Sequence, residues 1–189
     1  IVVEQELSIE TLAGLIKARI NLDKYITVDM GSPTFNPDEI PTLLSIGVNG
    51  LPQGYLNIDG QEFKVYAAGM GNPHMIIFVD DLTKIKLEKL GKKLEKNEFF
   101  PSRTNVHFVL INSRQLLQVI VWERGSGVTL ACGTGACACL VVTNKLGLCD
   151  NSVEVNLPGG NMYIKWPSMD SNVYMKGPAE PIYTGQIKL

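Results

Sequence analysis

One segment restricts the possible folds more than any other part of the sequence. Residues 133–146 read GTGACACLVVTNKL, a run of small and apolar residues with few polar ones, followed by Gly147 as a helix C-cap. A helix that is apolar on nearly every side has to be buried. We therefore predict a helix over Gly133–Leu146 at the centre of the fold.

Most of the remaining sequence is typical of strands. Apolar periodicity predicts them at residues 9–19 (broken at Gly14), 25–30, 55–58, 61–68, 75–79, 105–111, 116–123, 152–156 and 161–166. Pro158-Gly159-Gly160 predicts a hairpin between the last two, so most of the sheet should be antiparallel. The result is an α+β fold, a mostly antiparallel sheet wrapped around a central helix.

The only other convincing helix is expected over Lys86–Lys96. Its alternating Lys, Leu and Glu residues are typical of the solvated face of a short amphipathic helix. The Gly-Ser-Pro and Asn-Pro sequences at residues 31–37 interrupt the strand pattern and place a domain boundary near residue 33. Residues 37–41 should form a short helical turn.

Composition excludes several classes of function. The 189-residue chain is 45% hydrophobic and carries a formal net charge of −2, so it has no basic excess for nucleic acid. It lacks an apolar run long enough to span a bilayer and a signal-peptide layout at its start. We expect a soluble cytoplasmic protein. Because the first residue is Ile, we also expect the true beginning of the protein to lie upstream.

The four cysteines, Cys132, Cys137, Cys139 and Cys149, lie within eighteen residues but form no CxxC pair. With no histidine nearby they do not make a zinc set, so we predict no metal site. Three of them lie in or beside one helix, where disulfides are geometrically awkward, and free thiols are expected.

Cys132 lies where a glycine-rich turn enters the predicted central helix. Unpaired N–H groups and the positive end of the helix dipole favour an anion there, which predicts a lowered thiol pKa. The N–H groups of Gly133 and Thr134 could hold a carboxylate. The alternative is a buried structural cysteine, the usual fate of an isolated one and our interpretation of the other three. From the residue pattern alone, both interpretations stay open.

Two further groups could recognise a ligand. Glu123-Arg124 could bind the ammonium and carboxylate of an amino acid, or could be an ordinary surface pair. In Gly71-Asn72-Pro73-His74, the proline restricts Asn72 and could aim its amide, while His74 could be a general base or simply a turn residue. Asn105 is a weaker candidate.

Together these segments resemble the diaminopimelate epimerase family over essentially the whole chain. The matching stretches are TLAGLI, ITVDMGSPTF, GNPH with IIFVDDL, FFPSRTNVHFV, VWERGSGVTLACGTGACA, LPGGNMYIKW and VYMKGPAEPIYTG. Proline racemase-like and phenazine-biosynthesis-like proteins, the alternatives with this fold, do not usually carry WERG and ACGTGA at this spacing.

The resemblance implies two pseudo-symmetric domains with the site between them, no pyridoxal phosphate, no other cofactor and no metal. Two cysteines would face opposite sides of the substrate α-carbon, one removing a proton as thiolate and the other delivering one as thiol. LL- and meso-diaminopimelate would interconvert, supplying lysine and cell-wall synthesis. The family also implies a homodimer.

Carried over by motif, Cys132 is the acid/base thiol of the C-terminal domain, with Gly133 and Thr134 binding the reacting carboxylate. Asn72, Asn105, Glu123 and Arg124 would hold the distal amino acid end. His74 and Glu123 would tune the two thiols, and Tyr183 would contact the second subunit of the dimer.

Two departures follow from the same comparison. The family's other thiol lies in a CGNG-type turn that this sequence lacks, and Met75 stands where many relatives have a further cysteine. We therefore expect residues 1–32 and 178–189 to be parts of an N-terminal domain, residues 33–177 to be a complete C-terminal domain, and the isolated chain to be inactive. The competing hypotheses are a non-catalytic amino acid-binding domain and a thiol-redox protein.

Overall fold

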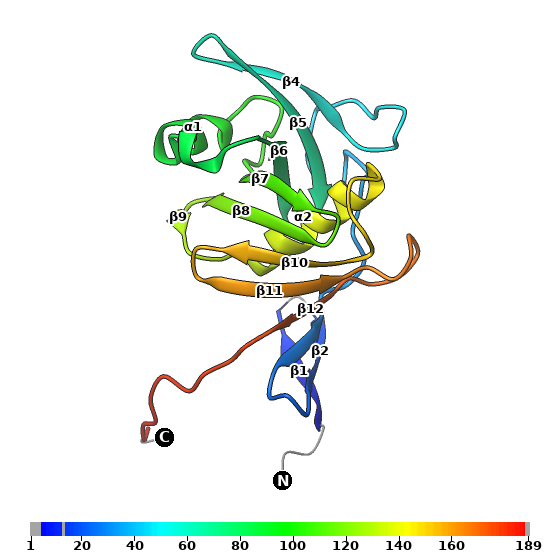
Figure 1. The fold of residues 1–189 in the computed structure, drawn as a ribbon, viewed down its shortest axis with the longest axis vertical. Coiled ribbons are helices and arrows are strands. Elements are labelled where there is room, and N and C mark those ends of the chain that lie inside the picture. Colours follow the sequence, from blue (N-terminus) through cyan, green and yellow to red (C-terminus); the bar gives the residue numbers. More distant parts are fainter. Residues whose placement is uncertain (1–4, 13, 188–189) are drawn as a thin grey trace.

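The computed structural model describes residues 5–12 and 14–187, in which one sheet of twelve strands curves around a central helix (Figure 1). The strands are β1 (Gln5–Thr11), β2 (Gly14–Ile20), β3 (Ile26–Asp29), β4 (Gln53–Ile58), β5 (Gln61–Gly69), β6 (Pro73–Phe78), β7 (Asn105–Ser113), β8 (Leu116–Glu123), β9 (Gly127–Thr129), β10 (Ser152–Leu157), β11 (Gly160–Lys165) and β12 (Tyr174–Gly177). The helices are the 3₁₀ turn η1 (Leu82–Lys84), α1 (Leu87–Leu94) and α2 (Gly133–Lys145).

The sheet order is β1-β2-β3-β12-β11-β10-β8-β7-β6-β5-β4, with β9 paired to the free part of β8. Its pairings are antiparallel except for β8 with β10 and β6 with β7, which run parallel. The hairpin of β1 and β2 extends away from the body of the sheet, and residues 178–187 leave β12 as an extended tail (Figure 1). Because β3 pairs with β12, the sheet continues across the predicted boundary near residue 33.

Helix α2 forms the centre of the larger core, as its sequence predicts. Residues 135–143 are all buried, and they pack against side chains from both arms of the curved sheet. Gly147 follows the helix with φ of 74°, a left-handed conformation that glycine adopts without strain and that ends the helix. Burial of this many apolar side chains is the main source of stability in this part of the fold.

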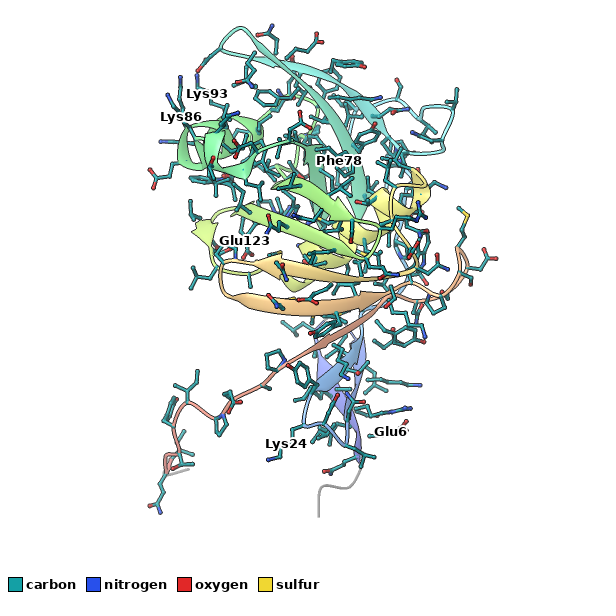
Figure 2. The ribbon with its side chains drawn as sticks, in the orientation of Figure 1. Glu6, Lys24, Phe78, Lys86, Lys93 and Glu123 are labelled. Atoms are coloured by element: carbon teal, nitrogen blue, oxygen red, sulfur yellow. The ribbon has the colours of Figure 1, made fainter. Side chains whose placement is uncertain are left out.

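Helix α1 lies on the outer side of the sheet and belongs to a second apolar cluster. Leu90, Gly91 and Leu94 face that cluster, whereas Lys86 and Lys93 project outward (Figure 2). The absence of a Cβ at Gly91 matters, since one would lie 2.5 Å from Cγ of Trp122. The helix therefore approaches β8 closely enough to contact the strand end that carries Glu123.

The sequence-based predictions agree with these elements to within four residues, but they lack the 3₁₀ turn η1. The predicted strands and both helices are present, and Pro158-Gly159 does connect β10 to β11. The short strands β9 and β12 were not predicted. In the first predicted strand, residues 9–19, the break at Gly14 is the β1–β2 turn; residue 13 lies outside the described residues, as do residues 1–4 and 188–189 of the predicted end segments.

None of the helices within the described ranges is both long and apolar enough to cross a membrane.

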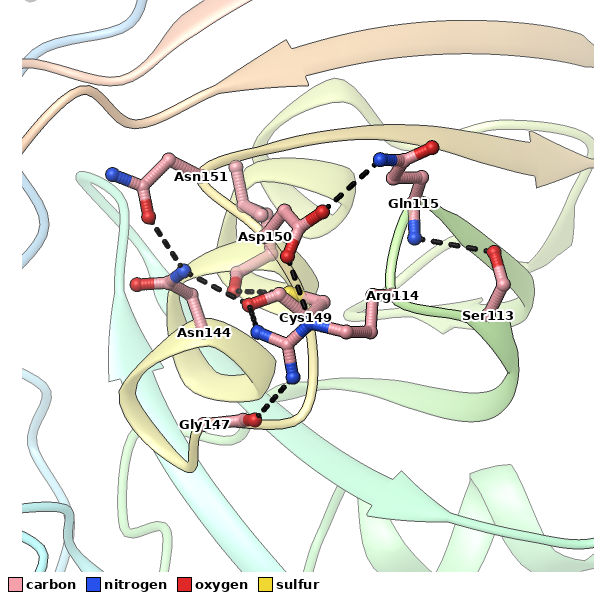
Figure 3. A network of polar contacts seen from close by, with 9 residues as sticks. Ser113, Arg114, Gln115, Asn144, Gly147, Cys149, Asp150 and Asn151 are labelled. Carbon is pink, nitrogen blue, oxygen red and sulfur yellow. Dashed lines mark hydrogen bonds and ion pairs between the residues drawn. The ribbon is translucent and has the colours of Figure 1, made fainter.

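The C-terminal end of α2 is held by Arg114, from the β7–β8 turn (Figure 3). Its guanidinium donates hydrogen bonds to the carbonyl oxygens of Gly147 and Cys149, at 2.9 and 3.3 Å, and to the Asp150 carboxylate at 2.8 Å. These carbonyls follow the last helical turn, where backbone acceptors lack helical partners. Arg114 thus attaches the end of the central helix to the sheet.

We predict that Arg114→Ala lowers the free energy of unfolding by ~1 kcal/mol, because the side chain is partly exposed and its hydrogen bonds are partly replaced by water. Urea unfolding of the variant would measure this. Arg19→Ala is the control, since its ion pair with Glu6 at 2.7 Å is solvent-exposed and should contribute less. Equal effects of the two substitutions would contradict a special role for Arg114.

Candidate functional site

The parallel pairing of β6 and β7 brings two predicted site segments together. His74 is the register partner of Asn105, so the segment Gly71–His74 and the start of β7 lie side by side. Gly71 has φ of 78°, which places the turn before β6 in a conformation suited to glycine. Asn72 and His74 therefore lie at the same end of the sheet as Asn105, which follows them by about thirty residues in sequence.

Asn105 is buried and connects this end of the sheet to the Glu123-Arg124 segment. Its Nδ2 donates to the Pro73 carbonyl oxygen at 2.9 Å, and its Oδ1 accepts from the Arg124 backbone N–H at 2.9 Å. Its second amide N–H makes no hydrogen bond to another described residue. The described contacts give Asn105 a clear role in ordering the site, while its predicted contact with substrate stays a prediction.

Glu123 is the last residue of β8 (Figure 2), and Arg124 begins the glycine turn that follows. Gly125 and Gly127 have φ of 81° and 83°, so both positions favour glycine. Glu123 accepts a hydrogen bond from the Thr129 hydroxyl, and the Arg124 guanidinium donates to the Ser102 carbonyl oxygen at 3.0 Å. Arg124 is exposed, which leaves most of its guanidinium available for an anion.

Glu95, which the sequence analysis did not identify, holds this turn from behind. Its carboxylate is nearly inaccessible and accepts from Trp122 Nε1 at 2.7 Å and from the Gly125 N–H at 3.1 Å. Its carbonyl oxygen accepts from the Thr104 N–H at 3.1 Å. In a lysine-rich helix, a glutamate is expected to be exposed to solvent. The sequence therefore gives no sign that Glu95 is buried and supports the Trp122–Gly125 turn.

Cys132 is the N-cap residue of α2, with extended backbone geometry (φ −140°, ψ 108°). Its Sγ lies 3.6 Å from the Thr134 hydroxyl, and the residue is 6% exposed. The unpaired N–H groups of the first helical turn face the same region, because an N-cap precedes them directly. The predicted placement of a thiol at a helix terminus with unpaired N–H groups is therefore confirmed, while anion binding there stays a prediction.

The predicted lowering of the Cys132 pKa is wrong. Burial raises the pKa of this thiol above its usual value, and the nearby Glu123 carboxylate raises it further. Hydrogen bonding from Thr134 and the Gly135 backbone lowers the pKa, but not enough to offset desolvation. The thiol is therefore protonated at neutral pH in this structure.

The other three cysteines are free and buried, as predicted. Burial raises the pKa of the Cys137 and Cys139 thiols strongly, and that of Cys149 to about 12. Among the described residues there is no cluster of three or more His, Cys, Asp or Glu side chains that could bind a metal ion.

His74 contacts Asn72 rather than Cys132. Its Nε2 lies 2.8 Å from Asn72 Oδ1, and its Nδ1 lies 2.9 Å from Nε2 of His107, a residue not identified from the sequence. Burial lowers the pKa of His74 well below its usual value, with smaller effects of His107 and Arg124. Burial also lowers the pKa of His107, so both rings are uncharged at neutral pH. Tuning of a thiol by His74 stays a prediction.

A groove of 350 Å³ runs beside the entrance to α2, lined mostly by apolar side chains, including Ala131, Met162 and Met175. Gly133 adjoins it: a Cβ there would lie 2.9 Å from the Met175 sulfur.

Tyr183 lies apart from the predicted site residues, in the extended tail, and is 86% exposed. The structure thus brings Asn72, His74, Asn105 and Arg124 together and leaves Tyr183 outside.

Comparison with known proteins gives a family match and several relatives of high sequence identity. The diaminopimelate epimerase family matches residues 66–182. A diaminopimelate epimerase of Prochlorococcus marinus (strain MIT 9313) is 54% identical, with 96% of this chain and 60% of the relative covered. One from Carboxydothermus hydrogenoformans is 47% identical, with 97% and 65% covered. The chain thus spans less than two thirds of these relatives.

Solved structures with the same fold are more distant in sequence. A probable proline racemase from Agrobacterium radiobacter K84 superposes with a TM-score of 0.67 at 13% identity, covering 98% of this chain and 61% of that one. A hydroxyproline epimerase from Agrobacterium vitis gives 0.63 at 16% identity, covering 93% and 57%. These likenesses confirm the predicted fold.

We predict that Glu95→Ala destabilises the protein by about 2 kcal/mol, because the indole N–H of Trp122 and the N–H of Gly125 lose a buried acceptor. Glu88→Ala, on the exposed side of α1, is the control and should change stability little. Urea unfolding gives both values. A fluorescence spectrum of Trp122 unchanged by the Glu95 substitution would contradict the assigned contact.

We predict that Cys132 alkylation by iodoacetamide is slow at pH 7 and rises by roughly tenfold per pH unit while the thiol remains mostly protonated. Glu123→Gln removes a charge that raises the Cys132 pKa, so it should increase the thiolate fraction and the rate at pH 7. Peptide mass spectrometry would follow Cys132 specifically. Glu88→Gln is the control, and a slower reaction in Glu123→Gln would contradict the electrostatic assignment.

Proposed function

Because the chain belongs to the diaminopimelate epimerase family, we propose that it supplies one half of a site that interconverts LL- and meso-diaminopimelate. The observation that carries the proposal is Cys132 at the N-terminus of a buried helix, in the ACGTG segment that the family comparison includes. A thiol in this position can exchange a proton with one face of a bound α-carbon.

The protonated state of Cys132 supports a specific role in one direction of the reaction. A buried thiol with a raised pKa is a proton donor at neutral pH. In the proposed step, a thiolate on the opposite face removes the α-proton and Cys132 delivers its own proton to the other side. The configuration inverts, and Cys132 becomes the thiolate that serves as base in the reverse reaction.

Negative charge that develops during proton removal spreads onto the carboxylate attached to the α-carbon. The N–H groups of Gly133 and Thr134 belong to the first turn of α2, where they have no helical acceptor. We assign them to this carboxylate, because donors fixed in place before the reaction stabilise the charge that forms. The helix dipole acts in the same direction.

The distal end of the substrate would lie against the opposite part of the site. Arg124 offers an exposed guanidinium for a carboxylate, and Glu123 offers a carboxylate for an ammonium group. Asn105 donates to the carbonyl oxygen of Pro73, the residue after Asn72, and accepts from the Arg124 backbone N–H. A substrate with two amino acid ends would satisfy both parts of the site at once.

The second thiol of this scheme lies outside the 189 residues, in an N-terminal domain. In support, the chain covers only 60–65% of the lengths of the Prochlorococcus and Carboxydothermus epimerases, and its four cysteines are otherwise assigned. Residues 33–177 would form the C-terminal domain, while residues 1–32 and 178–189 would complete the N-terminal one. Exposed Tyr183 is then available for a contact within a homodimer.

Two other functions fit the structure less well. A thiol-redox role requires a second accessible cysteine near Cys132, whereas Cys137, Cys139 and Cys149 are all buried with raised pKa values. A purely amino acid-binding role does not need a proton-donating thiol at the helix N-terminus.

We place the epimerase in the cytoplasm, where its product would supply lysine and peptidoglycan precursors.

The proposal predicts that Cys132→Ala in the intact protein lowers the rate of diaminopimelate inversion by roughly 10²–10⁴-fold, because the acid on one face is lost. In D₂O the wild-type product should carry deuterium at the inverted α-carbon. Chiral chromatography and mass spectrometry would measure both. The isolated 189-residue chain should show neither inversion nor coupled exchange.

Cys149→Ala is the matched control, since it removes a buried thiol on the far end of α2 and should retain activity. Circular dichroism would establish that the Cys132 variant is folded. Retention of full activity by Cys132→Ala, or robust turnover by the isolated chain, would refute the two-thiol assignment.

A further inference from the structure

The two histidines of the chain form a buried pair that the proposed chemistry does not explain. His74 on β6 and His107 on β7 both have no exposed surface, and one ring nitrogen of each lies 2.9 Å from the other. His74 continues the contact to Asn72 Oδ1 at 2.8 Å. Three side chains therefore form a row, His107–His74–Asn72, which we call the histidine relay.

Hydrogen bonding along the relay permits few arrangements. Burial lowers the pKa of His107 to about 3 and that of His74 well below its usual value, so each ring carries one proton. A single proton then lies between the rings. If His107 Nε2 donates it, His74 Nδ1 accepts, and His74 Nε2–H is left to donate to Asn72 Oδ1.

The opposite arrangement would require His74 Nδ1 to donate and His107 to carry its proton on Nδ1. That nitrogen is buried and has no hydrogen-bond partner among the described residues. An unpaired N–H in the interior is costlier than an unpaired lone pair. The reversed order would also make Asn72 turn its amide to present Nδ2 to His74. The first arrangement is therefore the stable one.

The His107 ring cannot easily rotate out of this arrangement, because it lies directly beneath the first turn of α2. A Cβ added at Gly135 would lie 2.1 Å from His107 Cε1, so the ring occupies the space that a side chain at residue 135 would take. Backbone pairing fixes the other side, since His107 is the register partner of Ile76 on β6. The ring orientation thus follows from packing.

We propose that His107 is a positioning residue that fixes the Asn72 amide, through His74, with its NH₂ group directed to the ligand. With Oδ1 occupied by His74, Asn72 presents donors only, and its Nδ2 has no acceptor within the described chain. Donors select a carboxylate over an ammonium group. Arg124, whose positive charge influences His74, adds to the same preference.

The inference rests on the proposed function for the identity of the ligand: Asn72 would bind the distal carboxylate of diaminopimelate, while Glu123 is left for the distal ammonium. The orientation of Asn72 by the two rings does not depend on that identity. The relay connects the first turn of α2, which packs on His107, to Asn72, which would bind the distal end of the substrate.

Nitrogen NMR of the intact protein labelled with ¹⁵N-histidine tests the proton positions directly, since protonated and bare ring nitrogens resonate far apart. At pH 7 we expect His107 with Nε2 protonated and Nδ1 bare, and His74 with the same tautomer. Loss of one set of signals in His107→Gln assigns the rings. The opposite tautomer for either ring would overturn the relay.

Kinetics of the intact enzyme test its effect. His107→Leu removes the donor to His74 and should raise KM for diaminopimelate by roughly five- to tenfold, with kcat within about twofold, as expected for one lost orienting hydrogen bond. His107→Gln can place an amide N–H near the former Nε2 and should restore KM. Val109→Ala, a buried change on the same strand that leaves the relay intact, controls for lost stability.

An unchanged KM in His107→Leu, or equal impairment of the Leu and Gln variants, would overturn the positioning role. A similar rise of KM in Val109→Ala would also overturn it, because the effect would then be general destabilisation. If the wild-type protein did not epimerise diaminopimelate at all, the proposed function would fail, whereas the ring assignments would still decide the orientation of Asn72.

Discussion

The close approach of the first turn of α2 to the sheet is the contact on which the rest of the site depends. Gly133 lies against Met175 of β12, and Gly135 lies against His107 of β7, so neither position has room for a side chain. These two contacts bring the helix N-terminus onto two strands that are distant along the sheet. Both glycines therefore allow the helix end that carries Cys132 to pack closely against the sheet.

The parallel step in the sheet has a second effect on the site. Antiparallel neighbours can be joined by short turns, whereas β6 and β7 require a long crossover, residues 79–104. That crossover includes α1 and delivers Glu95 to the back of the Trp122–Gly125 turn. The segment that connects two site strands therefore also supports the third site element.

The sequence predicted the elements better than their connections. A run of small and apolar residues identifies α2, apolar periodicity identifies most strands, and the glycine pattern around Cys132 identifies the helix N-terminus, because all three signals are local. Glu95 and His107 carry no such signal: their roles come from neighbours far away in sequence. The predicted thiol pKa failed for the same reason, since the helix terminus is visible in the motif but the depth of burial of Cys132 is not.

The burial and protonation of Cys132 also bear on oxidative damage. Peroxides attack thiolates, and access to the sulfur limits the rate as well. A thiol that is 6% exposed, with a raised pKa, should resist conversion to sulfenic acid in the absence of substrate. The burial that keeps the Cys132 thiol protonated would thus also protect its sulfur from oxidation.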